Sequence, residues 1–337
     1  MAGPKKEIDP TWTQTLIRGI RNGETAALAQ AITLVESTRP QHLEMANTIV
    51  EENLKNAGKS IRIGITGVPG VGKSTFIEVF GKLLTSKGKK VAVLAVDPSS
   101  TVSRGSILGD KTRMQELVKD AHAFIRPSPT GNSLGGVAKK TRETMVLCEA
   151  AGYNVILVET VGVGQSETAV HGMVDFFLLL KLAGAGDELQ GIKRGIVEMA
   201  DAVVISKADG DNQKRAKMAQ QEFKRALHLY PPKSNGWVPK VLTCSALNGE
   251  GMDQIWDMIG GYLDTAVASD HFHQKRKEQN KYWLLNHLDE LIKDHFHHNN
   301  EVSKALQRFL ETVGNGKISP FKAAQKLMQL YHKSLKI

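Results

Sequence analysis

The first part of the chain, residues 11–57, carries apolar residues at the spacing of amphipathic helices. The apolar positions that recur before residue 40 are Leu16, Ile17, Ile20, Ala27, Leu28, Ile32 and Val35. Pro40 interrupts this pattern, and a second helix is predicted from Leu43 to Gly58, because glycine is a typical C-terminal stop. Residues 1–60 are therefore predicted to form an N-terminal helical arm, which carries no evident chemistry.

The pattern changes at Ser60, where short apolar runs begin to alternate with helical stretches. These runs are Ile61–Thr66, Val91–Val96, Ala121–Ile125, Val155–Glu159, Phe176–Leu180, Ala202–Ser206 and Val241–Cys244. Such runs, separated by amphipathic helices, are typical of a mostly parallel sheet with helices on both faces. Residues 61–268 are therefore predicted to form an α/β domain whose ligand site lies in the glycine-rich turns after its strands.

Helical spacing returns over residues 269–337, the predicted C-terminal arm. Its first helix places apolar side chains on one face, at Trp283, Leu284, Leu288, Leu291 and Ile292. A polar break at His298–Asn300 separates this helix from two more, predicted around Leu306–Val313 and Pro320–Leu335. We expect the apolar face to be buried against the N-terminal arm or a second subunit. A role of this arm in dimerisation rests mainly on a resemblance to a known family.

Composition and charge narrow the classes of protein to consider. The chain has 337 residues, and its longest apolar runs fall far short of the roughly 18 residues that cross a bilayer. Its polar start lacks the apolar core of a signal peptide, so a cytoplasmic protein is expected. The net charge of +9 comes from bases mixed with acids, without a nucleic-acid-reading motif. Neither a membrane nor a nucleic acid is an expected partner. Cys148 and Cys244 lack CxxC spacing and are predicted to be buried apolar residues.

A phosphate-binding loop follows the first predicted strand. Gly67-Val-Pro-Gly-Val-Gly-Lys-Ser74 matches G-x-x-x-x-G-K-[ST] and leads into a predicted helix at Phe76–Leu84. Its glycines allow backbone N–H groups to wrap the β-phosphate, Lys73 neutralises the β- and γ-phosphates, and the Ser74 hydroxyl ligates Mg²⁺. The α-phosphate is assigned to Thr75. The predicted nucleotide-binding residues here are Gly67, Val68, Pro69, Gly70, Val71, Gly72, Lys73, Ser74 and Thr75.

Two loops after later strands favour guanine as the base. Ser206-Lys-Ala-Asp209 resembles the N/T-K-x-D signature, in which a carboxylate accepts hydrogen bonds from guanine that adenine cannot offer. Lys207 can lay its methylene stem along the base, whereas Ser206 in place of asparagine is expected to loosen the loop's support. The second loop resembles the S-A-K/L loop, whose backbone meets the guanine oxygen, and consists of Ser245, Ala246 and Leu247.

Candidate metal ligands lie at other strand ends. Glu159-Thr-Val-Gly162 stands where G proteins usually carry D-x-x-G, so that Glu159 can hold Mg²⁺ through a water and Gly162 can offer its N–H to the γ-phosphate. Asp97 is favoured as a residue of the metal shell, although Asp-Pro also starts turns. Asp110 suits a switch loop but equally a helix N-cap. Gln165 differs in register from the water-positioning residue of small GTPases, so the general base stays open.

The loop Ala183–Lys193 contains three glycines, two acids, an amide and a lysine directly after an apolar strand. Several glycines, which make the backbone flexible, beside such varied polar groups favour a mobile switch loop.

Together these residues resemble the MeaB/ArgK family of G proteins, which includes the human MMAA protein. Beyond the phosphate loop, the resemblance rests on Val96–Ser100, Ser103–Arg113, Glu159–Gln165, Ala183–Lys193 and Ser206–Asp209. It implies a P-loop domain of the SIMIBI type with GTP/GDP and Mg²⁺ as ligands. It also implies a homodimeric GTPase that helps load and protect the adenosylcobalamin of methylmalonyl-CoA mutase.

The resemblance also assigns roles to individual residues. It places Asp97, Asp110 and Glu159 around Mg²⁺, makes Ala183–Lys193 a third switch, and implicates Lys193 in activation by the partner. The candidate catalytic residues are thus Lys73, Asp97, Asp110 and Lys193. The segment Ser128–Leu134 is less typical of the family, and no role is assigned to it.

Two other functions compete with this interpretation. A nickel metallochaperone GTPase would use surface ligands, for which the candidates are His271, His273, His295, His297 and His298. Histidines at i and i+2 do not share a helix face, so solvated surface residues are the simpler explanation. A small-molecule P-loop kinase would need an acid–base pair for its acceptor and a lid, and the two guanine loops weigh against it.

Overall fold

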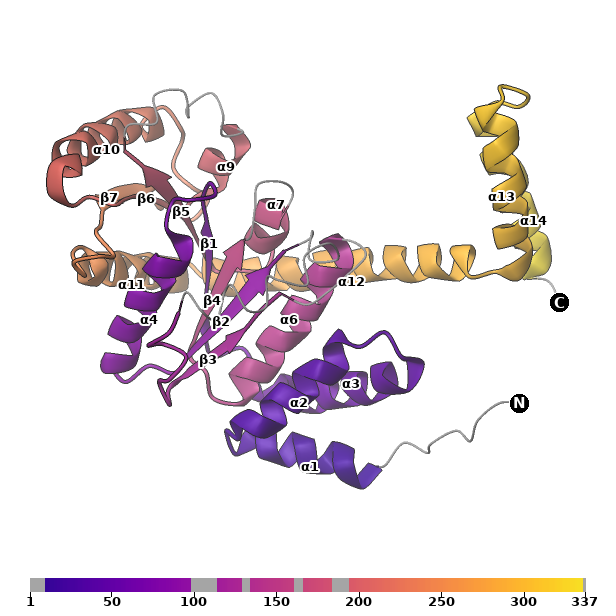
Figure 1. Ribbon diagram of the computed structural model, residues 1–337, viewed down its shortest axis with the longest axis horizontal. Helices are drawn as coiled ribbons and strands as arrows, with labels where there is room; N and C mark the ends of the chain where they lie inside the picture. Colours follow the sequence, from indigo (N-terminus) through magenta and orange to yellow (C-terminus); the bar gives the residue numbers. More distant parts are fainter. Residues whose placement is uncertain (1–9, 98–113, 129–133, 161–165, 184–193, 336–337) are drawn as a thin grey trace. The chain divides into compact units, whose positions relative to one another are not determined.

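The computed structural model describes residues 10–97, 114–128, 134–160, 166–183 and 194–335. Within them, seven strands form one sheet in the order β3-β2-β4-β1-β5-β6-β7, and every neighbouring pair is parallel. The strands are β1 (Ile61–Thr66), β2 (Val91–Val96), β3 (Ala123–Arg126), β4 (Val155–Thr160), β5 (Phe176–Leu182), β6 (Ala202–Ser206) and β7 (Lys240–Thr243). The predicted α/β fold with a parallel sheet is confirmed (Figure 1).

The predicted strands agree closely with the observed ones, and β4 shows why some bounds differ. Glu159 was expected at or just beyond the end of this strand, but it pairs with Ile65 of β1 on one side and Ala95 of β2 on the other. Because β4 lies between two neighbours, the ladder continues through Glu159 to Thr160. The carboxylate of Glu159 is therefore carried by a rigid strand.

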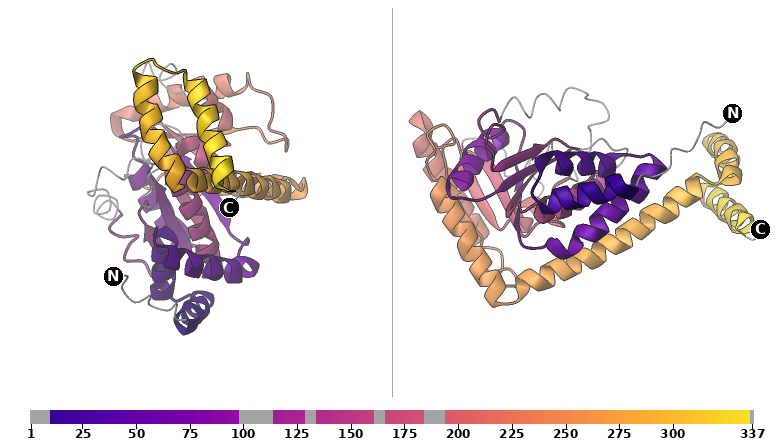
Figure 2. Two further views of the ribbon diagram at one scale, coloured as in Figure 1. Left: turned by 90° about the vertical axis from the view of Figure 1, so that its right-hand side faces the viewer. Right: turned by 90° about the horizontal axis from the view of Figure 1, so that it is seen from below.

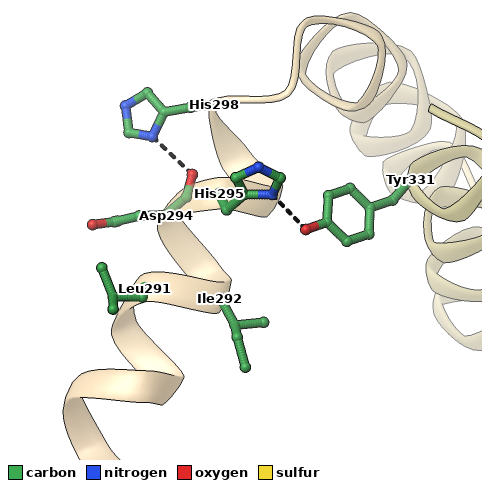
Figure 3. A pocket seen from close by; sticks show the side chains of 6 residues that line it. All are labelled: Leu291, Ile292, Asp294, His295, His298 and Tyr331. Atoms are coloured by element: carbon green, nitrogen blue, oxygen red, sulfur yellow. Dashed lines mark hydrogen bonds between the residues drawn. The ribbon is translucent and has the colours of Figure 1, made fainter. Parts of the chain in front are cut away.

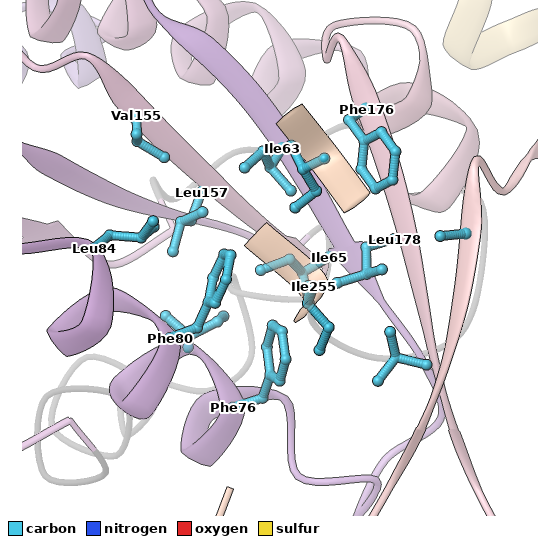
Figure 4. Packing of buried hydrophobic residues seen from close by; sticks show 14 of the residues in the cluster. Ile63, Ile65, Phe76, Phe80, Leu84, Val155, Leu157, Phe176, Leu178 and Ile255 are labelled. Atoms are coloured by element: carbon cyan, nitrogen blue, oxygen red, sulfur yellow. The ribbon is translucent and has the colours of Figure 1, made fainter. Parts of the chain in front are cut away.

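Alternation along β5 and β6 divides the apolar side chains between the two faces of the sheet. On one face, Leu178 and Val204 join a cluster with α4 (Lys73–Ser86) and α11 (Met252–Ala268). Figure 4 shows Phe76 and Phe80 of α4 in this cluster, and their rings stack 5.3 Å apart. On the opposite face, Leu179 packs with α9 (Arg194–Met199) and α10 (Gln213–Leu227). The helix α7 (Ser166–His171) lies against β4 and β1.

The N-terminal arm consists of α1 (Pro10–Arg21), α2 (Thr25–Glu36) and α3 (Pro40–Asn53), followed by a 3₁₀ turn, η1 (Leu54–Asn56). The single helix predicted before Pro40 is wrong, because the chain turns between α1 and α2 at Gly23, whose φ is +77°. All three helices pack against α6 (Leu134–Ala150), and Arg126 forms an ion pair with Glu36 of α2 (Figures 1 and 2).

The chain forms two compact units, Met1–Gln279 and Asn280–Ile337, and the division falls within α12 (His271–His297). The second unit contains the end of α12 together with α13 (Asn300–Gly314) and α14 (Pro320–Ser334), which lie side by side (Figure 2). Asn299 and Ser319 cap the starts of these two helices through their side chains. No helix in the described part of the chain is both long and apolar enough to cross a membrane.

Candidate nucleotide-binding site

The predicted site residues that the structure describes converge on one edge of the sheet. Since all strands are parallel, their carboxyl ends share this edge, and β1 lies centrally between β4 and β5. The chain moves from β1 outward to β2 and later returns to the other side through β5, which makes the end of β1 a topological switch point. Ligands in open α/β sheets bind at such a point, and the loop that follows β1 there is Gly67–Gly72.

The backbone of this loop requires glycine at defined places. Gly70 and Gly72 have φ values of +82° and +96°, which side-chain-bearing residues rarely adopt. A Cβ atom on Gly67 would stand 2.6 Å from the backbone oxygen of Leu180 in β5. At Gly67 the loop therefore approaches the neighbouring strand more closely than a residue with a Cβ atom would allow. Gly72 directly precedes α4, so the loop ends at a helix N-terminus, which favours anions.

Lys73 folds back over the loop and is nearly buried. Its Nζ donates to the carbonyl oxygen of Gly67 at 2.7 Å and to that of Val68 at 3.4 Å. Burial lowers the pKa of Lys73, and the nearby carboxylates of Glu159 and Glu167 partly offset this effect. These carboxylates favour the charged form of the lysine, which is the form that can neutralise phosphate.

Ser74 and Glu159 are the described residues that best fit a magnesium ion. The Ser74 hydroxyl donates to Oε1 of Glu159 at 3.3 Å, so the hydroxyl and the carboxylate already face the same place. Mg²⁺ prefers such oxygen donors, and it usually takes only one or two protein groups while phosphates and waters complete its shell. The described residues contain no group of three or more His, Cys, Asp or Glu side chains that could hold a metal ion.

Asp97 follows β2 at the same edge and is only 5% exposed. Its backbone N–H donates to the hydroxyl of Ser128 at 2.8 Å. The adjacent pair Val96 and Thr160 connects β2 with β4, the strand that carries Glu159. Asp97 and Glu159 thus come from neighbouring strands.

Ser206, at the end of β6, joins three parts of the site. Its Oγ lies 2.8 Å from the carbonyl oxygen of Val71 in the phosphate loop and 3.1 Å from that of Lys181 in β5. The expected loosening of this loop is therefore not found, because the short hydroxyl reaches both backbones directly. Lys207 adds a further link, since its Nζ donates to the carbonyl oxygen of Gly70 at 2.9 Å.

Asp209 and Ser245, from the two predicted base loops, are in direct contact. The Ser245 hydroxyl donates to Oδ2 of Asp209 at 2.6 Å and accepts a hydrogen bond from the backbone N–H of Asn248 at 3.1 Å. Two backbone hydrogen bonds between Ser245 and Glu250 close the second loop. Ala246 is half-buried and Leu247 is 82% exposed beside them. The carboxylate that is predicted to select guanine is thus held in place by its neighbour.

Three of the predicted site residues, Asp110, Gly162 and Lys193, lie outside the described residues. In turn, the structure adds two buried polar residues that the sequence did not single out. Glu167, 2% exposed, stands in the first turn of α7 near Lys73, and Ser128, 7% exposed, follows β3. Neither belongs to a recognised pattern, and only the adjacency of strands and helices brings them to the site.

Two of the histidines considered for nickel have other contacts. In the C-terminal unit, Nδ1 of His295 lies 2.6 Å from the Tyr331 hydroxyl, and Nδ1 of His298 lies 2.8 Å from the Asp294 carbonyl oxygen. They line a cavity of about 560 Å³ together with Leu291 and Ile292 (Figure 3). Both cysteines are free and buried, as predicted.

Known proteins resemble this chain over almost its whole length. The family model of the methylmalonyl Co-A mutase-associated GTPase MeaB matches residues 28–301. GTPase ArgK of Escherichia coli K12 is 48% identical over 313 residues, which are 93% of this chain and 95% of ArgK. The mitochondrial methylmalonic aciduria type A homolog of Mus musculus is 48% identical over 326 residues, 94% of this chain and 79% of the mouse protein.

Solved structures agree with these sequences. The crystal structure of an LAO/AO transport system kinase superimposes with a TM-score of 0.77 at 40% identity. The match covers 97% of this chain and 100% of the transport system kinase.

Proposed function

The chain belongs to the MeaB family of methylmalonyl-CoA mutase-associated GTPases, and from this premise we propose that its GTP hydrolysis serves an adenosylcobalamin-dependent methylmalonyl-CoA mutase. It is a GTPase and binds guanine nucleotide, as its relatives' names indicate. Its proposed task is to assist the loading and the protection of the mutase cofactor. The observation that carries the proposal is the contact between Ser245 and Asp209, which holds the carboxylate that we propose reads the guanine base.

The proposed site divides the work among separate groups. Asp209 reads the guanine edge, the backbone of Gly67–Gly72 surrounds the phosphates, and Lys73 stabilises the negative charge on the transferred phosphoryl group. Ser74 and Glu159, with Asp97 close by, would hold Mg²⁺. When bound, this ion would polarise the β- and γ-phosphates. By family resemblance, Asp110 completes the metal shell and Lys193 acts when the partner stimulates hydrolysis.

Homodimerisation is a second part of the proposal. In the C-terminal unit, α12 exposes apolar side chains that a soluble helix normally buries, namely Leu284, Leu285, Leu288, Leu291 and Ile292. Each is at least 49% exposed. Such a contiguous apolar face is typical of an interface, and a second copy of the same helix would offer a matching face.

The competing functions receive less support. A nickel chaperone would need a ligand cluster, and none is found in the part of the chain that the structure describes. A P-loop kinase has no need of a carboxylate selected for guanine, and the family is one of GTPases. The mutase-associated role therefore remains the best-supported one.

The test is GTP turnover measured with and without purified methylmalonyl-CoA mutase. We expect slow hydrolysis by the chain alone and a clear increase when mutase is added. Lys73→Ala provides the inactive control, with a loss on the order of 100-fold or more. Hydrolysis that an excess of mutase leaves unchanged would overturn the proposed partner, whereas the assignment as a GTPase would stand.

A further inference from the structure

The ladder between β2 and β3 ends just before the nucleotide site. Its registered pairs run from Val91 and Ala123 to Leu94 and Arg126. The next residue on the β3 side, Pro127, is no longer paired with β2. At Asp97, the backbone N–H donates to a side chain instead of to a backbone carbonyl of the neighbouring strand.

That side chain is the hydroxyl of Ser128. It accepts a hydrogen bond from the backbone N–H of Asp97 at 2.8 Å, and it lies 3.4 Å from the carbonyl oxygen of the same residue. Both residues are buried, with 7% of Ser128 and 5% of Asp97 exposed. A buried backbone N–H needs such a partner, so the hydroxyl determines where the backbone of Asp97 lies.

The opposite side of β2 is fixed by β4. Val96 pairs with Thr160, and Ala95 pairs with Glu159. Glu159 in turn accepts from Ser74 of the phosphate loop. The backbone of Asp97 is therefore positioned between a strand that carries a candidate metal ligand and the hydroxyl of Ser128 on the edge side.

We propose that Ser128 is a positioning residue for hydrolysis, because it holds the Asp97 carboxylate in register with Glu159 and Ser74. This inference rests on the proposed role of Asp97 in the magnesium shell. Ser128 makes no contact with the metal or the nucleotide in this account, and it acts only through Asp97. Groups that orient metal-binding residues typically change metal affinity or activity by roughly 10- to 100-fold when removed.

The experiment measures Mn²⁺ binding to the full chain with a bound non-hydrolysable GTP analogue, by electron paramagnetic resonance. Ser128→Thr and Ser128→Val form the decisive pair, since they have nearly the same shape and differ in the hydroxyl. Asp97→Asn reports the role of the carboxylate itself. Ser60→Ala is a matched control, because this buried serine donates to Glu149 at 2.5 Å at the amino end of β1, away from the site.

We expect Ser128→Val to weaken Mn²⁺ binding roughly tenfold, and Ser128→Thr and Ser60→Ala to stay near the wild-type affinity. Metal-free GDP affinity should be unchanged in all of these variants, because Lys73, Lys207 and Asp209 keep their partners. The value of kcat should fall in Ser128→Val at an unchanged KM for GTP. Thermal unfolding of each variant confirms that it is folded.

The two proposals can fail separately. Equal Mn²⁺ affinities in Ser128→Thr and Ser128→Val, together with a loss in Asp97→Asn, would overturn the role of Ser128 alone. A wild-type affinity in Asp97→Asn would instead overturn the proposed metal role of Asp97.

Discussion

Single side chains hold the phosphate loop by binding its carbonyl groups. Lys73 donates to Gly67 and Val68, Lys207 donates to Gly70, and the Ser206 hydroxyl lies against Val71. The residues that are expected to contact the nucleotide therefore also fix the loop before it binds. Such preorganisation lets charged groups act on phosphate without rearrangement during the reaction.

At the base site, one substitution should change which nucleotide is preferred. In Asp209→Asn, the carboxylate that accepts from guanine becomes an amide, which can donate to the additional carbonyl group of xanthine. We expect the affinity for GTP to fall and the affinity for xanthosine triphosphate to rise. Competition binding with both nucleotides measures the change. An unaltered preference for GTP would show that another residue reads the base.

The half-buried His171 of α7 should give the fold a measurable dependence on pH. Burial, assisted by the charges of Lys275 and Lys233, lowers its pKa from 6.5 to about 4. Between these values the unfolded chain binds a proton that the folded chain does not, so the stability falls as the pH is lowered through this window. From pH 7 to pH 5 the loss should be about 2 kcal/mol.

The measurement for His171 is urea unfolding at pH 7 and at pH 5. His171→Phe keeps an aromatic ring beside Phe177, whose ring lies 5.4 Å from that of His171. Between pH 7 and pH 5, the free energy of unfolding of this variant should fall by about 2 kcal/mol less than that of the wild type. Equal losses would mean that His171 titrates normally in the folded protein.

At the scale of elements, apolar runs in the sequence predict the strands well because the inner strands of this sheet are buried on both faces. The turn at Gly23 was missed, since apolar residues keep helical spacing across it. The site could be predicted where it follows recognised patterns, as at Lys73 and Asp209. Ser128 could not be predicted, because its proposed role depends on β3 lying beside β2, which local sequence does not reveal.

The start of α12 is attached to the sheet by a buried ion pair. Arg276 donates to both oxygens of Asp175, at 2.9 and 2.7 Å, and to the carbonyl oxygens of Gly58 and Ser60. The side chains of Arg276 and Asp175 are 13% and 2% exposed. This arrangement connects α12, the start of β5 and the segment before β1.

Removing one partner of this pair should therefore be costly. We expect Arg276→Met to lower the free energy of unfolding by about 3 kcal/mol, since it leaves a buried carboxylate without its cation. The double variant with Asp175→Asn should recover part of this loss. Chemical denaturation of the single and double variants measures both effects. If the single variant were as stable as the wild type, the pair would have no structural importance.

At the scale of the whole molecule, the exposed apolar face of α12 predicts self-association. Leu288→Glu combined with Ile292→Glu places two charges on this face, where burial would be strongly unfavourable. We expect the wild type to be a dimer and this variant to be a monomer that still hydrolyses GTP, by light scattering coupled to size exclusion. Lys304→Glu, on α13, is the control for added charge. A wild-type chain that is monomeric at micromolar concentration would contradict the proposed interface.

The candidate site and the proposed role toward the mutase both depend on selection of guanine. The most direct test is calorimetric titration of the purified chain, in the presence of Mg²⁺, with a non-hydrolysable analogue of either GTP or ATP. The account predicts that the GTP analogue binds more tightly by roughly 10⁴-fold, because a site built for hydrogen bonds rejects a base that lacks them. Equal affinity for the two analogues would contradict it.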